Sequence, residues 1–217
     1  MIEAVIFDMD GLLVDTNPAW TSARAWMARE AGQTWGPEDD QAVMGVSTQE
    51  WADYQIERLG LSLTRDEVAA AIIDRMVQTY RDGIPWLPGA IEAVDMAASR
   101  YRVGLASGSP PELIEAVTSD DAVRGSFEVI VSADEIGAGK PAPDVYLATA
   151  ERLGVDPGAC VCLEDSANGI RSGVAAGMQV IAVPDAGFRP PDDVLAQAHL
   201  VLEDLTNLTP ERLEQLG

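Results

Sequence analysis

The stretch Ala4-Val5-Ile6-Phe7-Asp8-Met9-Asp10-Gly11 is a short apolar run that ends in two acids. Its β-branched and aromatic residues predict a buried β-strand. Side chains alternate along a strand, so Asp8 and Asp10 project from one face, roughly 6–7 Å apart, while Met9 projects from the other. Gly11 permits a sharp turn after the strand. Unpaired carboxylates are rarely placed against a core without a function, although two solvated loop acids would give the same pattern.

From Pro88 onward, short apolar runs of the same kind alternate with stretches of helical periodicity. The runs predict strands at 102–106, 127–131, 159–163, 179–183 and 200–202, and the stretches between them predict helices at 89–100, 111–119, 143–153 and 167–176. Apolar strands that alternate with helices predict an α/β fold with a parallel sheet covered on both faces. Ligands of such sheets bind at the carboxyl ends of the strands.

Between the first strand and Pro88 the sequence has no strand pattern, and it predicts an all-helical insert over residues 17–85. Apolar residues at helical spacing predict helices at 18–31, 48–59 and 64–80. Asp66 and Glu67 would lie in the first turn of the third helix, as is typical of helix N-termini. We therefore expect a core of residues 1–16 and 86–217, interrupted by this helical insert.

The composition excludes several classes of partner. The formal net charge is −22 and the pI is near 4.1, which argues against binding to nucleic acid or to an anionic membrane surface. The N-terminus lacks a basic segment followed by a long apolar run, and no stretch approaches ~20 apolar residues, so we expect no signal peptide and no membrane span. These features predict a cytoplasmic protein, and a monomer is the default expectation.

The cysteines and the histidine are predicted to be structural. Cys160 and Cys162 lie on the same face of one predicted strand, too close in sequence for an easy disulfide, and no further cysteine could complete a zinc site. They are predicted to be buried core thiols. His199 is the single histidine and lies in an apolar run near the C-terminus. A mechanism that uses histidine as the base is therefore not expected.

Lysine is scarce in this chain. Lysine and arginine together number 14, and Lys140 is the only lysine among them. It lies in the loop Gly137-Ala138-Gly139-Lys140-Pro141-Ala142-Pro143-Asp144, after a predicted strand. Arginine cannot replace lysine where a compact point charge is required. Lys140 is therefore a candidate site residue, although chance survival of one surface lysine is an alternative.

Polar residues follow several of the predicted strands and would meet at one edge of the sheet. These residues are Asp8, Asp10, Ser107, Lys140, Glu164 and Asp165. Two like charges 4 Å apart repel by about 4 kcal/mol at an effective dielectric constant near 20, so four carboxylates need a compensating cation. Oxygen ligands without a suitable histidine or cysteine predict Mg²⁺. The candidate metal ligands are the carboxylates of Asp8, Glu164 and Asp165 and the backbone carbonyl of Asp10.

The other groups at this edge indicate phosphoryl transfer. The Ser107 hydroxyl, with the backbone N–H groups around Gly108, would form an anion cradle, and Lys140 would add a positive charge. Asp8 would attack phosphorus and form an aspartyl phosphate. Asp10 would protonate the leaving oxygen and then deprotonate the attacking water.

Four motifs, in order, resemble those of the haloacid dehalogenase-like hydrolases. The first is Phe7-Asp8-Met9-Asp10-Gly11-Leu12-Leu13-Val14-Asp15-Thr16, and the second is Ala106-Ser107-Gly108-Ser109. The third is Lys140-Pro141-Ala142-Pro143-Asp144, and the fourth is Leu163-Glu164-Asp165-Ser166-Ala167-Asn168-Gly169. The helical insert resembles the cap of the β-phosphoglucomutase and 2-deoxyglucose-6-phosphatase-like subgroup. The resemblance implies a Rossmann-like core, Mg²⁺, and closure of the cap over a small phosphorylated substrate.

Within this family, a phosphatase acting on a sugar phosphate is the favoured function. Dehalogenases lack the second acid, present here as Asp10, and phosphonatases need a cap lysine, which the helical insert lacks. A sugar-phosphate mutase is the main alternative. Mutases of this subgroup are similar at Gly45-Val46-Ser47, but they carry a histidine where this chain has Trp20, and they hold a second phosphate with a cap lysine and arginine. Here the following residue is Thr48.

Other features leave the function and the substrate open. A non-catalytic phospho-aspartate switch would use a similar set of residues, but it would have no helical insert and no need for Asp10. Trp20, Trp51 and Trp86 could stack on a sugar ring or belong to the core, and the loop at 44–47 is expected to select the substrate. Val183-Pro184-Asp185 resembles the 2-deoxyglucose-6-phosphatase-like members. The arginines of the helical insert that could bind a second phosphate, or simply carry surface charge, are Arg24, Arg75 and Arg81.

Overall fold

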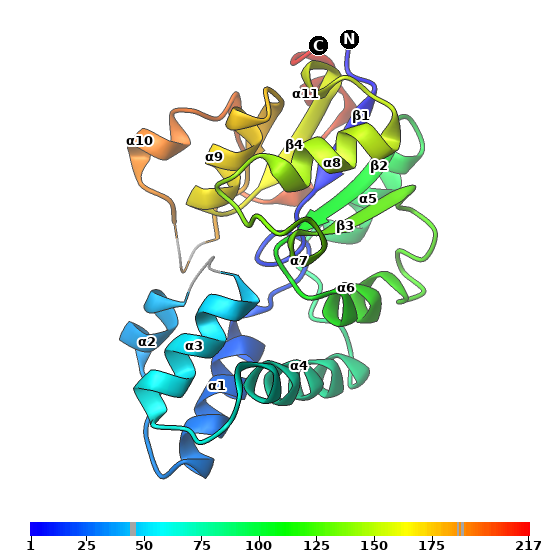
Figure 1. Cartoon of the computed structure of the whole chain (residues 1–217). Coiled ribbons are helices and arrows are strands. Elements are labelled where there is room, and N and C mark those ends of the chain that lie inside the picture. The colour runs from blue at the N-terminus through cyan, green and yellow to red at the C-terminus, as the bar shows by residue number, and fades with distance from the viewer. Residues whose placement is uncertain (44–46, 186, 188) are drawn as a thin grey trace.

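A six-stranded parallel sheet forms the centre of the core in the computed structural model (Figure 1). The structure describes residues 1–43, 47–185, 187 and 189–217. The strand order is β3-β2-β1-β4-β5-β6, so β1 is central and the chain order changes direction there. The strands are β1 (Ala4–Phe7), β2 (Arg102–Ser107), β3 (Val129–Ser132), β4 (Cys160–Glu164), β5 (Gln179–Ala182) and β6 (Leu200–Val201). The predicted α/β class and every predicted strand are confirmed, with ends shifted by one or two residues.

Both faces of the sheet are covered because the side chains of β1 alternate between two buried clusters. Val5 and Phe7 pack on one face with α5 (Ala90–Ala98), α6 (Pro111–Thr118) and α11 (Pro210–Glu214). Ala4 and Ile6 pack on the other face, and the helices there are α8 (Asp144–Leu153), α9 (Ala167–Ala175) and α10 (Asp192–Leu195). This alternation leaves no polar face on the central strand, as expected for a parallel sheet.

The helical insert lies beyond the carboxyl ends of the strands, below the sheet in Figure 1. It contains α1 (Asn17–Glu30), α2 (Pro37–Ala42), α3 (Thr48–Leu59) and α4 (Arg65–Arg81). Capping boxes begin two of these helices, with Ser47 and Glu50 at α3 and Thr64 and Glu67 at α4. The sequence correctly predicted three of the helices and missed α2, because six residues are too few to show helical periodicity.

Two antiparallel linkers connect the helical insert to the core. Val14, which leaves β1, forms a β-bridge with Trp86, which returns to the core. The Asp15 N–H donates to the carbonyl oxygen of Pro85 at 2.9 Å. The entry and exit of the helical insert are therefore held side by side. In addition, α4 packs against α6 of the core.

The cysteines and the histidine lie in structural positions, as predicted. Cys160 and Cys162 are free and buried, and both belong to the same buried cluster as Ile6. His199 precedes β6, where its Nδ1 accepts a hydrogen bond from the Val180 N–H at 3.0 Å. Within the described residues, no helix combines the length and apolar character needed to cross a bilayer.

Candidate active site

Lys140 joins three strands at the carboxyl edge of the sheet. Its Nζ donates to Asp8 Oδ1 and to Glu164 Oε1, each at 2.5 Å, and to the Ala106 carbonyl oxygen at 3.1 Å. Asp8 follows β1 directly, and its N–H donates to the Leu163 carbonyl oxygen of β4 at 3.1 Å. The lone lysine of the chain is therefore buried between two carboxylates, at the edge of the sheet where the candidate site residues were expected to meet.

Burial dominates the electrostatics of this group. It raises the pKa of Asp8, and the Lys140 ammonium opposes this effect while Glu164 and Asp10 add to it. Burial alone would lower the pKa of Lys140, but the charges of Asp8 and Glu164 raise it above its usual value. Lys140 therefore stays protonated and partly neutralises the buried acids.

Asp8, Glu164 and Asp165 each place one carboxylate oxygen within 4.8 Å of the others. Oδ1 of Asp165 is buried and has no hydrogen-bond partner among the described residues. Burial raises the pKa of Asp165 well above its usual value, and the charges of Glu164 and Asp8 raise it further. A buried, unpaired carboxylate oxygen beside two other acids fits a hard divalent cation such as Mg²⁺. The residues present thus fit the metal that the sequence predicted.

Glycine lets the chain approach the carboxylate of Asp165. Gly11 has φ +76°, and a Cβ at this position would lie 2.3 Å from Asp165 Oδ2. Both the turn after β1 and the space for the acid therefore require glycine.

Glu164 is saturated by hydrogen-bond donors. Its Oε1 accepts from Lys140 and from the Tyr146 hydroxyl at 2.7 Å, and its Oε2 accepts from the Ser166 hydroxyl at 3.1 Å and the Ser166 N–H at 3.3 Å. A Cβ on Gly169 would lie within 2.0 Å of the Glu164 carboxylate atoms. Although Glu164 lies within reach of a cation, its contacts fit best with holding Lys140 in place.

Asp10 is held by hydroxyl groups rather than by cations. Its Oδ2 accepts from the Ser109 hydroxyl at 2.8 Å and from the Ser107 hydroxyl at 3.1 Å. Its Oδ1 lies 3.5 Å from Nε1 of Trp20, which comes from α1 in the helical insert. The Asp10 carboxylate is therefore oriented by donors from both the core and the helical insert.

Ser109 is a site residue that the sequence analysis missed. Its N–H donates to Ser107 Oγ at 2.9 Å, and its carbonyl oxygen accepts from the Ser132 hydroxyl at 2.7 Å. Ser107, which was expected to bind phosphate, here directs its hydroxyl to Asp10, and Gly108 between the two serines is exposed. In the sequence, Ser107 and Ser109 are two positions apart, as Asp8 and Asp10 are. This shared spacing was the signal that could have identified Ser109.

Trp20 and Trp51 meet edge to face inside the helical insert, with ring centroids 5.9 Å apart. Trp51 is buried, so its predicted alternative as a core residue is confirmed. The Arg24 guanidinium lies 4.9 Å from the Trp20 ring centroid and 3.5 Å from Asp40 Oδ1. Arg24 is buried, and the interpretation of this residue as surface charge is therefore wrong. Sequence periodicity could not show that α2 would supply Asp40 as a partner.

The other residues that the sequence analysis considered for binding the substrate are Trp86, Arg75, Arg81 and the loop at 44–47. Trp86 packs against the buried cluster at the linkers. The Arg75 guanidinium lies 4.9 Å from the ring centroid of Trp26, and Arg81 is exposed. The predicted selective loop at 44–47 lies outside the described residues except for Ser47.

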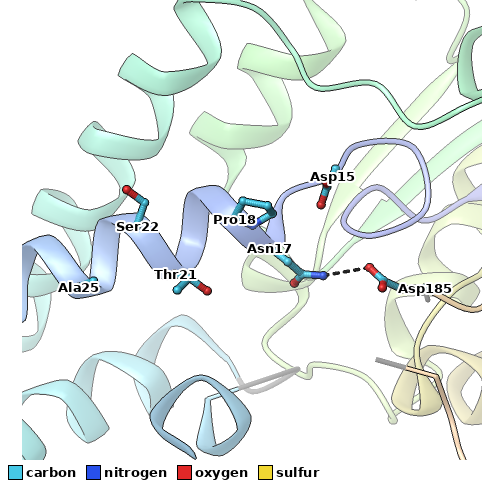
Figure 2. Close-up of a pocket in the computed structure, with 7 residues that line it drawn as sticks. All are labelled: Asp15, Asn17, Pro18, Thr21, Ser22, Ala25 and Asp185. Carbon is cyan, nitrogen blue, oxygen red and sulfur yellow. Dashed lines mark hydrogen bonds between the residues drawn. The ribbon is translucent and has the colours of Figure 1, made fainter. Parts of the chain in front are cut away.

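An open cleft of about 580 Å³ lies between α1 and Asp185, which follows β5 (Figure 2). Across it, Nδ2 of Asn17 in α1 donates to Oδ2 of Asp185 at 3.1 Å, a residue of the segment after β5. On α3, the Thr48 hydroxyl donates to Oδ2 of Asp134 in α7 (Ala133–Ile136) at 2.8 Å. Together with Trp20 and Asp10, these two pairs place hydrogen bonds between the helical insert and the core on both α1 and α3. The lining of the cleft consists of Asp15, Asn17, Pro18, Thr21, Ser22, Ala25 and Asp185.

Comparisons with known proteins extend over almost the whole chain. The family model of the haloacid dehalogenase-like hydrolases matches residues 2–177. Hexitol phosphatase B of Escherichia coli (strain K12) is 37% identical over 224 residues, which cover 98% of this chain and 96% of that protein.

Solved structures share both the core and the helical insert. The crystal structure of CbbY from Rhodobacter sphaeroides in complex with phosphate has a TM-score of 0.87 and 26% identity, covering 99% of this chain and 100% of that chain. β-Phosphoglucomutase from Clostridium difficile has a TM-score of 0.84 and 25% identity, covering 100% of this chain and 97% of that chain. These likenesses confirm the resemblance that the four motifs predicted. The chain therefore belongs to the haloacid dehalogenase-like hydrolases, as an enzyme of their phosphatase and phosphoglucomutase-like branch.

Proposed function

We propose that this enzyme is a Mg²⁺-dependent phosphatase that hydrolyses the phosphate monoester of a sugar or a sugar alcohol. The observation that supports it best is the buried group formed by Asp8, Lys140 and Glu164 beside the unpaired oxygen of Asp165. This group combines a nucleophile, a positive charge and a cation site at one edge of the sheet. The likeness to hexitol phosphatase B supports the class of substrate.

In the first half of the reaction, a carboxylate oxygen of Asp8 forms a bond to phosphorus. The bond from phosphorus to the ester oxygen breaks, and that oxygen takes a proton from Asp10. Lys140 keeps Asp8 in place and offsets the negative charge of the transferring group. The products are the alcohol and a phosphoryl group on Asp8.

In the second half, water attacks phosphorus and Asp10 accepts a proton from it. The acyl phosphate bond of Asp8 breaks, which releases inorganic phosphate and restores the carboxylate. The hydroxyls of Ser107 and Ser109 hold the Asp10 carboxylate in one orientation for both proton transfers. The carboxylates of Asp8 and Asp165 and the backbone carbonyl of Asp10 would hold Mg²⁺, which would supply positive charge to the phosphoryl oxygens when bound.

The second candidate is a sugar-phosphate mutase, which the likeness to β-phosphoglucomutase favours. A mutase must bind a second phosphate group on the side of the helical insert. Thr48 comes directly after Gly45-Val46-Ser47. Its hydroxyl donates to Asp134, and the side chain has no positive charge with which to bind a second phosphate. Arg24 is buried and paired with Asp40. These contacts favour hydrolysis.

The test is phosphate release from a panel of sugar phosphates, sugar alcohol phosphates, nucleotides and small organic phosphates, with Mg²⁺ and then with EDTA. We expect release with Mg²⁺, loss of release with EDTA, and recovery when Mg²⁺ is restored. Asp8→Asn is the matched control and should abolish release while leaving the melting temperature nearly unchanged. Conversion of β-glucose 1-phosphate with a bisphosphate primer, without release from any member of the panel, would establish the mutase instead.

A further inference from the structure

Trp20 reaches from α1 of the helical insert to Asp10 of the core. Its Nε1–H donates to Oδ1 of Asp10 at 3.5 Å, whereas the hydroxyls of Ser107 and Ser109 both donate to Oδ2. An indole N–H is a donor only and cannot take a proton from the acid. Among the described residues, the core thus supplies no donor to Oδ1, and the helical insert supplies one.

The two carboxylate oxygens of Asp10 therefore have different tasks in the proposed reaction. Oδ2 accepts from two hydroxyls, which leaves it no free lone pair for a proton. Oδ1 accepts only the long contact from Trp20, so its second lone pair is free. The proton that Asp10 gives to the ester oxygen, and later takes from water, is consequently carried by Oδ1.

The indole ring of Trp20 is held from two sides by other residues of the helical insert. The Arg24 guanidinium lies 4.9 Å from its ring centroid, and the Trp51 ring meets it edge to face at 5.9 Å. Arg24 comes one helical turn after Trp20, so the two side chains lie on the same face of α1. These two neighbours fix the direction in which the indole N–H donates.

Arg24 has an environment that is costly for an arginine. Its side chain is only 9% exposed, its ion pair with Asp40 spans 3.5 Å, and its Nε has no hydrogen-bond partner within the part of the chain that the structure describes. Burial lowers the pKa of Arg24 to about 10, although Asp40 opposes this effect, so the guanidinium stays charged at neutral pH. A buried cation that has exchanged hydrogen bonds for the face of an indole ring calls for an explanation.

We propose that Trp20 is a positioning residue that directs Oδ1 of Asp10 toward the ester oxygen, and that Arg24 holds the indole in the orientation this requires. The inference rests on the proposed phosphatase function. Hydrogen bonds of catalytic groups are often long when no substrate is bound, so the separation of 3.5 Å between Nε1 and Oδ1 is compatible with this role.

The test uses two substrates that differ in their need for the Asp10 proton. Sorbitol 6-phosphate must release an alcohol, which requires protonation, whereas p-nitrophenyl phosphate releases a phenolate that is stable without a proton. Trp20→Phe removes the N–H and keeps an aromatic ring. We expect kcat/KM to fall about 5- to 20-fold for sorbitol 6-phosphate and to change less than about twofold for p-nitrophenyl phosphate. Acetyl phosphate, whose acetate also leaves without a proton, replaces p-nitrophenyl phosphate if the wild type does not hydrolyse the latter.

Trp26→Phe is the matched control, because Trp26 lies on the same helix with the Arg75 guanidinium 4.9 Å from its ring centroid. It should leave both kcat/KM values within about twofold of the wild type. An equal loss on both substrates in Trp20→Phe, no loss on sorbitol 6-phosphate, or the same selective loss in Trp26→Phe would overturn the role of Trp20 and leave the phosphatase function intact. A wild-type enzyme that releases phosphate from none of these compounds would overturn both.

Arg24→Met tests the second part of the proposal while leaving Trp20 in place. It removes the charge and keeps a long side chain, so we expect a selective loss of about 2- to 5-fold on sorbitol 6-phosphate. The double variant with Trp20→Phe should lose no more than Trp20→Phe alone, because Arg24 acts through the indole. No loss, an equal loss on both substrates, or losses that multiply in the double variant would overturn the role of Arg24.

Discussion

The shape of the Lys140 ammonium matters as much as its charge. One nitrogen serves Asp8, Glu164 and the Ala106 carbonyl oxygen at once. A guanidinium is larger and planar, and it cannot place one nitrogen at the centre of these three acceptors without displacing them.

Lys140→Arg is therefore expected to lower kcat by roughly 100-fold or more, although the charge is conserved. Steady-state kinetics on the best substrate would measure this loss, with the melting temperature checked to confirm folding. Near-normal turnover would mean that the reaction does not require a lysine at position 140.

Ser109 makes the shorter of the two hydroxyl contacts to Asp10. We expect Ser109→Ala to lower kcat about 10- to 100-fold with little change in KM, because a hydrogen bond to a charged group is worth about 1.5–3 kcal/mol. The exposed Ser99, whose hydroxyl bonds only to its own helix, provides the control variant Ser99→Ala. A rise in KM with unchanged kcat would instead assign Ser109 to substrate binding.

At the scale of elements, the strands were predictable because each is a continuous apolar run. The short helices α7 and α10 were missed because four residues contain barely one turn, and no periodicity can be read from them. Asp8 and Asp10 could be singled out because both follow the apolar run of β1, although β1 itself ends at Phe7 and neither acid lies on the strand. Arg24 and Tyr80 could not be interpreted from sequence, because their burial depends on how separate helices pack.

Asp39 is the buried acid of α2, and it ties this helix to the rest of the helical insert. Asp39 accepts hydrogen bonds from the Gly36 N–H at 3.0 Å, the Tyr54 hydroxyl at 2.9 Å and Arg58 Nε at 2.8 Å. Burial by itself would raise the pKa of Asp39, but these donors together lower it. The ionised form of Asp39 therefore stabilises the folded state.

We expect Asp39→Ala to lower the free energy of unfolding by about 1–3 kcal/mol at pH 7. Because the pKa of Asp39 is lower in the folded state, its contribution is complete above the unfolded value of about 3.9 and is lost as pH falls through the folded value. Urea unfolding at several pH values would measure the difference from wild type. A difference that persists unchanged at pH 2 would contradict the role of the charge.

At the scale of the whole molecule, acidic side chains greatly outnumber basic ones, 36 against 14. The excess negative charge repels itself in the compact state, and salt screens this repulsion over about 10 Å at 0.1 M. Raising NaCl from about 0.02 to 0.3 M should therefore raise the melting temperature by roughly 2–4 °C, which corresponds to about 1 kcal/mol. Calorimetry would measure the shift, and a falling melting temperature would show that ion pairs outweigh the net repulsion.

The paired linkers at Val14 and Trp86 make the enzyme modular. Because the chain leaves and re-enters the core at one place, what lies between can be lengthened, shortened or exchanged without changing the distance from Asp8 to the second strand. Under the proposed function, the chemistry at Asp8 and the selection of the substrate by the helical insert thus occupy separable parts of one polypeptide. A different set of helices grafted between these two residues would redirect the same phosphoryl chemistry to another alcohol.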